Sequence, residues 1–241
     1  MLTLLLFVSV LTFGQVSNSP TDTIQKTATK EKKISFRKQM RVLTKEQINQ
    51  LKSGALFVRL QTKKNSITAL RKIGREKIAD KMEREQKNYN LKIVSAFKTN
   101  FNFCPTYFFF SDYSQNIREK QFDKVIFLTD SLLPDTTIKF KESNFLTAEF
   151  GTIEQDTAKY FSHNSYESDG NWSLKRVESY YGGPNTGFGA LIIKSDQLIQ
   201  LRGPFPYYVR TFDSLPIKRS QNITVKKMNK KLYKYYDKRK K

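Results

Sequence analysis

The pattern of apolar and polar residues predicts a series of short strands around one strongly apolar stretch. That stretch is residues 100–111, NFNFCPTYFFFS, in which six of twelve residues are Phe or Tyr. Aromatic residues favour a pleated, packed surface, and a run that is apolar on both faces is typical of a strand buried on both sides. We therefore expect a strand over residues 101–110 at the centre of the core.

Other segments have the alternation or composition of strands. They are residues 55–60, 124–128, 137–141, 145–153, 172–181, 190–194 and 197–201. Turn-like residues predict two hairpins, one joining 137–141 to 145–153 and one joining 190–194 to 197–201 about Ser195 and Asp196. Residues 154–171 lack a sustained period and are expected to be mostly loop. Residues 203–208, GPFPYY, are expected to form a rigid aromatic turn that closes the domain.

A long helix is predicted between the first two strands, with Ser66 as its N-cap. Its apolar residues recur near a period of 3.6, and its other face alternates in charge sign, which is typical of a solvated surface. The apolar residues are Ile67, Leu70, Ile73, Ile78, Met82, Tyr89, Ile93 and Phe97. The order strand, helix, strand predicts a parallel pair joined by a right-handed crossover. Shorter helices are expected from Thr44, as a cap, to Gly54 and over residues 114–121.

These elements predict an α+β fold, in which a mixed β-sheet carries one long covering helix. The predicted single domain spans residues 53–217. A basic, largely disordered segment over 15–52 precedes it and a basic amphipathic tail over 218–241 follows it.

The first fourteen residues, MLTLLLFVSVLTFG, are apolar. They are too short for a membrane-spanning helix, which needs about 20 residues. The apolar run over 2–11 and the small residues Thr12 and Gly14 are typical of a signal peptide that is cleaved before Gln15. We therefore expect export to a bacterial periplasm or cell envelope. The alternative is that these residues form a buried strand of a cytosolic protein.

The charge of the chain is concentrated toward its ends. The net charge is +21, and residues 218–241 hold eleven Lys or Arg and one Asp. Within this tail Val225, Met228, Leu232 and Tyr235 fall at helical spacing, which predicts a basic amphipathic helix. We expect this helix to bind an anionic lipid or an acidic envelope component. The candidate binding residues are Lys226, Lys227, Lys230, Lys231, Lys234, Lys238 and Arg239.

Catalytic chemistry has one candidate pair. Cys104 is the only cysteine, so no intrachain disulfide forms. His163 is the only histidine, so it is the only imidazole that could lower the pKa of the Cys104 thiol. The competing interpretation is that Cys104 is an inert apolar residue of an aromatic strand. The acidic residues around His163 match no EF-hand spacing, and the glycines of 182–189 match no phosphate-binding motif, so the sequence predicts no metal and no cofactor.

The charge distribution favours a non-enzymatic envelope protein that binds through its basic tail. Two alternatives stay open. One is a hydrolase or transferase that uses Cys104 and His163, and the other is a cytosolic protein that binds nucleic acid, which export would exclude.

Overall fold

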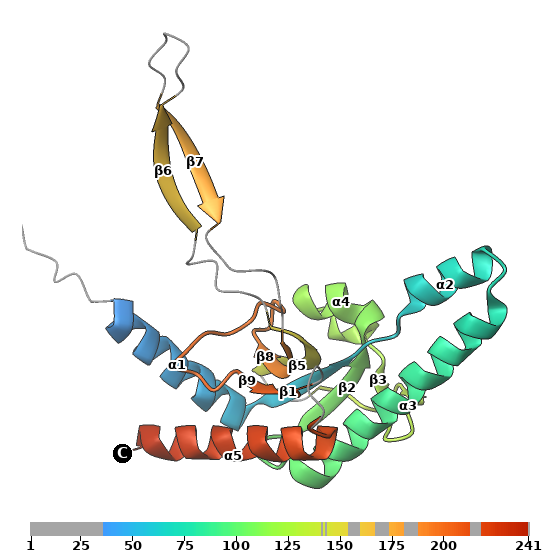
Figure 1. The fold of residues 1–241 in the computed structure, drawn as a ribbon. Coiled ribbons are helices and arrows are strands. Elements are labelled where there is room, and N and C mark those ends of the chain that lie inside the picture. Colours follow the sequence, from blue (N-terminus) through green and yellow to red (C-terminus); the bar gives the residue numbers. More distant parts are fainter. Residues whose placement is uncertain are drawn as a thin grey trace, which may run out of the picture. The chain divides into compact units, whose positions relative to one another are not determined.

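The computed structural model describes residues 36–140, 142, 144–153, 160–166, 174–180, 188–212 and 218–240. Its main feature is a five-stranded sheet in the order β2-β1-β5-β8-β9 (Figure 1). The strands are β1 (Ala55–Leu60), β2 (Thr106–Phe110), β5 (Phe145–Thr152), β8 (Gly189–Lys194) and β9 (Tyr208–Arg210). β1 pairs in parallel with β2 and β5, whereas β8 is antiparallel to β5 and β9. The sheet is therefore mixed, and the predicted α+β class is confirmed.

Helices and two small strand pairs complete the described part of the chain. The helices are α1 (Phe36–Ser53), α2 (Lys64–Lys72), α3 (Glu76–Asn100), α4 (Ser114–Arg118) and α5 (Gln221–Lys240), with the 3-10 turns η1 (Ser111–Tyr113) and η2 (Phe122–Lys124). The antiparallel pairs are β3 (Phe127–Leu128) with β4 (Pro134–Asp135), and β6 (Tyr160–Tyr166) with β7 (Leu174–Tyr180). Within the described ranges, no helix combines the length and the apolar character needed to cross a bilayer.

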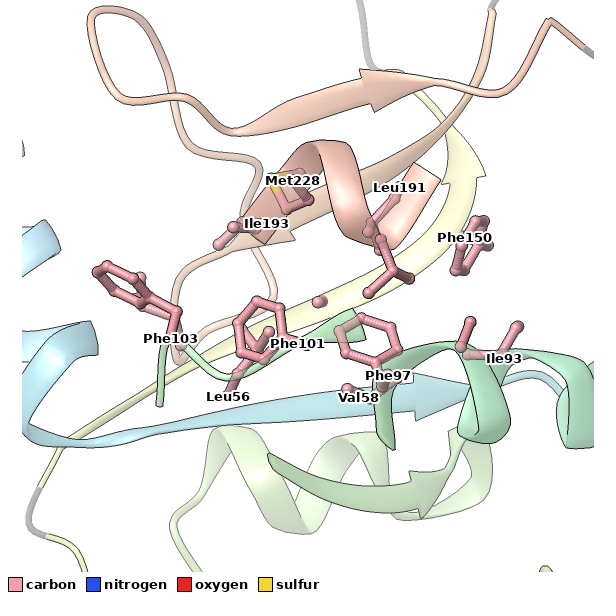
Figure 2. Packing of buried hydrophobic residues seen from close by; sticks show 14 of the residues in the cluster. Leu56, Val58, Ile93, Phe97, Phe101, Phe103, Phe150, Leu191, Ile193 and Met228 are labelled. Atoms are coloured by element: carbon pink, nitrogen blue, oxygen red, sulfur yellow. The ribbon is translucent and has the colours of Figure 1, made fainter. Parts of the chain in front are cut away.

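The larger core lies between one face of the sheet and the helices α1, α3 and α5. Figure 2 shows side chains from β1, α3, β8 and α5 gathered over this face. Phe97 of α3 and Leu191 of β8 have no exposed surface, and Met228 of α5 is equally buried. Burying a large apolar side chain stabilises a fold by about 1.5–3 kcal/mol, so all three helices are held to the sheet mainly by this core.

The opposite face of the sheet carries a second, largely aromatic core. Phe57 of β1 lies at its centre, fully buried, and contacts six other rings with centroid separations from 4.5 to 6.3 Å. These rings belong to Tyr107, Phe109, Phe122, Phe127, Phe140 and Phe145. Residues before and after the aromatic stretch 100–111 therefore pack together on this face of the sheet.

Two glycines determine how helices join their neighbours. At Gly54, between α1 and β1, an added Cβ would lie 2.1 Å from the carbonyl oxygen of Asn144, so only glycine allows this approach. Gly74 has a φ of 70° and separates α2 from α3. The prediction of one long helix from Ser66 is therefore wrong: two helices meet at a left-handed residue. Lys63, not Ser66, is the N-cap of α2.

The aromatic stretch differs from its prediction in length and place. β2 begins only at Thr106, because α3 continues to Asn100 and Pro105 has no N–H to donate to a sheet. β2 is also an edge strand, whereas β1 and β5 lie inside the sheet. Phe101 and Phe103 are nevertheless buried in the larger core (Figure 2). The parallel pairing of β1 with β2 is as predicted.

The first predicted hairpin does not form, and the second is reduced to a turn at Ser195 and Asp196 that brings Gln200 antiparallel to Lys194. Residues 137–140 are not a strand, and β5 lies between β1 and β8 instead. Residues 197–201 contribute one isolated bridge, from Lys194 to Gln200, while β8 pairs with β9. The predicted strand over 124–128 shortens to two residues, and the predicted loop over 154–171 contains β6. The local alternation of apolar and polar residues predicts the strands β5, β7 and β8. Their pairing partners are determined by contacts with other segments of the chain.

The N-terminal segment folds further than predicted. Thr44 is an internal, fully buried residue of α1 whose hydroxyl donates to the carbonyl of Met40 at 2.7 Å, so it is not a cap. Ile48 and Leu51 of α1 are fully buried in the larger core. The predicted signal peptide and its cleavage point before Gln15 lie outside the described residues.

Candidate anionic-surface site on helix α5

The helix α5 is amphipathic, as predicted, and its apolar face is part of the larger core. Val225, Met228 and Leu232 have no exposed surface, and Figure 2 shows Met228 among the side chains of the core. The hydroxyl of Tyr235 donates to the Oγ1 of Thr44 in α1 at 2.9 Å. α5 also contacts the C-terminal part of α3, which crosses it and then runs away from it (Figure 1). The segment predicted as a tail beyond residue 217 is therefore a packed helix of the fold.

The outward side of α5 is a row of exposed lysines, which we call the lysine face. It consists of Lys226, Lys227, Lys230, Lys234 and Lys238. Four of the five follow one another at intervals of four residues, so they are neighbours on one side of the helix. Among the described residues, none of these lysines forms an ion pair with a carboxylate.

The two remaining predicted cations have packing partners. The Nζ of Lys231 donates to the carbonyl of Tyr208 at 3.0 Å and lies 5.5 Å from the centre of that ring. Burial lowers the pKa of Lys231, and the positive charges of Arg219 and Lys227 lower it further. The guanidinium of Arg239 lies 4.9 Å from the ring of Tyr235 and donates to its hydroxyl at 3.0 Å. Lys231 is itself exposed and Arg239 is half-buried, so these two cations differ from the lysine face in packing on tyrosine rings.

A second group of cations beside α5 was missed from the sequence. Arg219 precedes α5, and its guanidinium lies 4.4 Å from the ring of Phe212 and donates to the carbonyl of Arg210 at 2.7 Å. Arg210 of β9 in turn lies 4.5 Å from the ring of Phe188. We call Arg210, Arg219, Phe188 and Phe212 the cation–aromatic strip. Its members are up to 31 residues apart in the sequence, so only the pairing of β8 with β9 brings them together.

The aromatic turn at 203–208 divides into buried and surface parts. Phe205 is 2% exposed and belongs to the larger core, which agrees with the interpretation of this turn as a cap that closes the domain. Tyr208 is half-buried and begins β9, where it receives Lys231. The turn therefore connects the core to the basic surface.

Cys104 lies in an environment that disfavours a thiolate. It is 9% exposed, and burial raises the pKa of its thiol to about 12, against a smaller lowering by Lys52. A thiol with this pKa has almost no thiolate at neutral pH, and the thiolate is the nucleophile. His163 lies in β6 opposite Val177, but its side chain is outside the described part of the structure. The pair of Cys104 and His163 therefore stays a prediction from the sequence.

The most buried charges form a cluster on the sheet. Glu149 of β5 accepts one hydrogen bond from Arg59 of β1 at 2.5 Å and pairs with the Nζ of Lys194 of β8 at 2.9 Å. Burial raises the pKa of Glu149, but the two cations more than offset this, so its pKa lies below the ordinary value. Both oxygens of the carboxylate are thus engaged. The cluster therefore links the neighbouring strands β1, β5 and β8.

The described residues line further concave surfaces beside α2 and α3. A cavity of about 650 Å³ beside α3 has an apolar part formed by Ile78, Met82, Tyr89 and Phe150 and a polar part that includes Lys63, Lys81 and Glu85. No group of three or more His, Cys, Asp or Glu side chains suited to a metal occurs within the described ranges.

Comparisons of the chain with protein-family models, with curated proteins and with solved structures find no match. The function is therefore argued from the surface of this chain alone.

Proposed function

We propose that this protein is a non-enzymatic binding protein of the cell envelope, and that the lysine face of α5 docks on an anionic surface. The observation that carries the proposal is the exposed row Lys226, Lys230, Lys234 and Lys238, with no carboxylate partner among the described residues.

The row is unfavourable for the isolated fold. Like charges four residues apart on a helix destabilise it by about 0.2–0.5 kcal/mol for each pair. An anionic surface removes this repulsion, and each lysine near an anionic membrane contributes about 1 kcal/mol of binding. The opposite side of α5 is fixed in the core by Met228 and Leu232, so the lysines are held in one direction before binding. Little additional ordering is then needed on contact, which favours affinity.

A charge-removal experiment tests the proposal. Deleting residues 218–241 would also remove buried side chains of the core, so substitution is the cleaner change. We expect the triple variant Lys226→Gln, Lys230→Gln and Lys234→Gln to weaken binding about 100-fold, since three lysines contribute about 3 kcal/mol. The probes are vesicles of phosphatidylcholine with phosphatidylglycerol, and a polyglutamate-coated surface, both at physiological salt.

The control variant removes the same charge from another helix. Lys77, Arg84 and Lys87 are exposed residues of α3, which also carries four acidic residues. Their replacement by Gln is expected to change binding less than threefold. Equal losses from the two triple variants would mean that net charge, not the lysine face, drives binding. Absence of binding to both probes would overturn the proposal.

The proposed place of action is the cell envelope, which rests on the apolar run over residues 2–11. We expect the protein, expressed with this N-terminus in a bacterial host, to appear in the envelope fraction as a chain beginning at Gln15. The measurement is the intact mass of the purified protein. A cytosolic chain that retains Met1 or Leu2 would contradict this placement and make nucleic acid the first partner to test.

A further inference from the structure

The cavity of about 650 Å³ beside α3 lies at the carboxyl ends of two parallel strands. Its lining includes Gln61 and Lys63, which follow β1, and Phe150 of β5. The next sheet strand after β1 is β2, on one side of this pair, and the next after β5 is β8, on the other side. Open α/β sheets bind ligands in the crevice at such a point, and small-molecule pockets measure about 300–1,000 Å³. The position and the size of the cavity therefore suit a small ligand.

One wall of the cavity is apolar and partly aromatic. Ile78 and Met82 follow one another at an interval of four residues on α3, so they are neighbours on the helix. The ring of Tyr89 meets the ring of Phe150 edge to face, with the centroids 6.3 Å apart. Ile78 is 47% exposed and Tyr89 is 38% exposed. An apolar or aromatic body that covers this wall removes its surface from water, which favours binding.

The amide of Gln86 supplies polar groups at the same cavity. Gln86 is only 7% exposed and lines the cavity from α3. Its Nε2 donates to the Oδ1 of Asn90 at 3.0 Å, and the Nδ2 of Asn90 donates to the carbonyl of Gln61 at 2.8 Å. Within the described part of the chain, the Oε1 of Gln86 and its second N–H have no hydrogen-bond partner. Buried polar groups are nearly always paired, so this donor and acceptor are suited to a ligand.

Two lysines give the cavity a positive charge. Lys63 and Lys81 line it together with one carboxylate, that of Glu85, which lies 3.9 Å from the Nζ of Lys81. Lys63 forms no ion pair with a carboxylate among the residues that the structure describes. It is also the N-cap of α2, which has no side-chain cap, so the positive end of the helix dipole adds to the attraction for an anion.

We propose that this cavity binds a planar nitrogen heterocycle that carries an anionic group. Nucleoside monophosphates and heteroaromatic carboxylates share this chemistry. The ring lies against Tyr89 and Phe150, the amide of Gln86 pairs with the polar edge of the ring, and Lys63 and Lys81 bind the phosphate or carboxylate. The site is distinct from the lysine face of α5 and goes beyond the function proposed for it.

The combination of groups disfavours simpler ligands. A plain acyl chain would cover the apolar wall but would also remove the amide of Gln86 from water without replacing its hydrogen bonds, which is costly. Inorganic phosphate would meet the lysines but would leave the apolar wall in water. A heterocycle with an anionic group satisfies the wall, the amide and the cations together.

Isothermal titration calorimetry of the full chain tests the proposal. The probes are adenosine and uridine monophosphate, orotate and nicotinate, with inorganic phosphate and dodecanoate for comparison. We expect at least one of the four heterocycles to bind with a dissociation constant below about 1 mM, and more tightly than either comparison compound. Binding of the nucleotides alone would identify a phosphate ligand, and binding of orotate or nicotinate alone would identify a carboxylate ligand. Either result supports the proposal.

Two variants test the polar contacts separately. Gln86→Leu removes the amide, and Lys63→Gly removes the amine at a residue whose φ is 52°, a conformation that glycine adopts without strain. Each is expected to weaken binding of the heterocycle about tenfold. The unfolding midpoint of Lys63→Gly is expected to be unchanged or raised, so its loss of binding is not a loss of fold.

Lys120→Gly is the matched control. Lys120 is an exposed lysine with a φ of 57° that follows α4 and does not line the cavity. Its replacement makes the same change of side chain and backbone freedom elsewhere, so binding is expected to stay within about twofold of the wild type. Circular dichroism of the three variants checks that they fold.

Three results would overturn the inference. They are no binding of any of the four heterocycles, tighter binding of phosphate or dodecanoate than of all four, and binding that neither Gln86→Leu nor Lys63→Gly weakens more than Lys120→Gly. The lysine triple variant of α5 is expected to bind the heterocycle as the wild type does. Failure of this inference is therefore distinguishable from failure of the proposed function.

Discussion

Replacing Phe57 with alanine is expected to lower the free energy of unfolding by about 3–5 kcal/mol. The ring is fully buried at the centre of the aromatic core and contacts six other rings. Its removal loses the transfer free energy of the phenyl group, leaves a cavity and breaks edge-to-face pairs that each contribute about 0.5–1.5 kcal/mol. Chemical denaturation monitored by circular dichroism measures the change.

Phe188→Ala is the matched control for this prediction. It removes the same side chain from a site that is 52% exposed, where the ring contacts Arg210. The expected loss is below about 1 kcal/mol. If Phe57→Ala cost no more than Phe188→Ala, the second face of the sheet would not be a packed core.

The second large effect is expected at the buried charge cluster. Glu149→Gln keeps the side-chain volume but removes the negative charge that pairs with Arg59 and Lys194. Only 12% of the Glu149 and Lys194 side chains is exposed, so water compensates little of this loss. We expect a loss of about 2–4 kcal/mol in the free energy of unfolding at pH 7, somewhat below the range for fully buried pairs because the Arg59 side chain is 23% exposed.

The same cluster predicts a pH dependence. The folded pKa of Glu149 lies below its ordinary value of 4.5, so the unfolded chain takes up this proton first as the pH falls. The stabilisation is therefore full above about pH 4.5 and is lost as the pH falls through the folded pKa. The difference in stability between wild type and Glu149→Gln is expected to narrow below pH 4.5. Urea denaturation at a series of pH values measures it.

A surface ion pair provides the comparison for Glu149. The carboxylate of Glu85 lies 3.9 Å from the Nζ of Lys81 on α3, and both side chains are mostly exposed. Glu85→Gln is expected to cost less than about 0.5 kcal/mol at pH 7. For Glu149, the difference in the free energy of unfolding between wild type and Glu149→Gln could instead stay constant down to acid pH. That result would show that the Glu149 side chain stabilises the fold by its shape rather than by its charge.

Part of the candidate site could be read directly from the sequence. The spacing of Val225, Met228 and Leu232 predicts a helix with one apolar face, and the lysines necessarily occupy the other face. Helical periodicity is local, so it survives in any fold that buries the apolar face. The sequence does not reveal that this face is part of the main core, because a free amphipathic helix on a membrane has the same pattern.

The cation–aromatic strip could not be predicted in this way. Phe188, Arg210 and Arg219 belong to three separate segments with no shared period. They meet because β8 pairs with β9 and because Arg219 follows β9 back toward the start of α5. The one local signal is Arg210, which precedes Phe212 by two residues, since no Arg or Lys lies within five residues of Phe188. It gains meaning only when the neighbouring strands are known.

The sequence predicts which segments form strands better than it predicts which strands pair with each other. The sequence by itself determined β1, with its bounds, and the strand character of β5, β7 and β8, because alternation and β-branched or aromatic content are local properties. It also determined the amphipathic helix at the C-terminal end. The order of the sheet, the edge position of β2, the break at Gly74 and the burial of Cys104 were decided by the tertiary structure. The physical reason is that pairing and burial depend on which distant segments fill the same space, and no single segment carries that information.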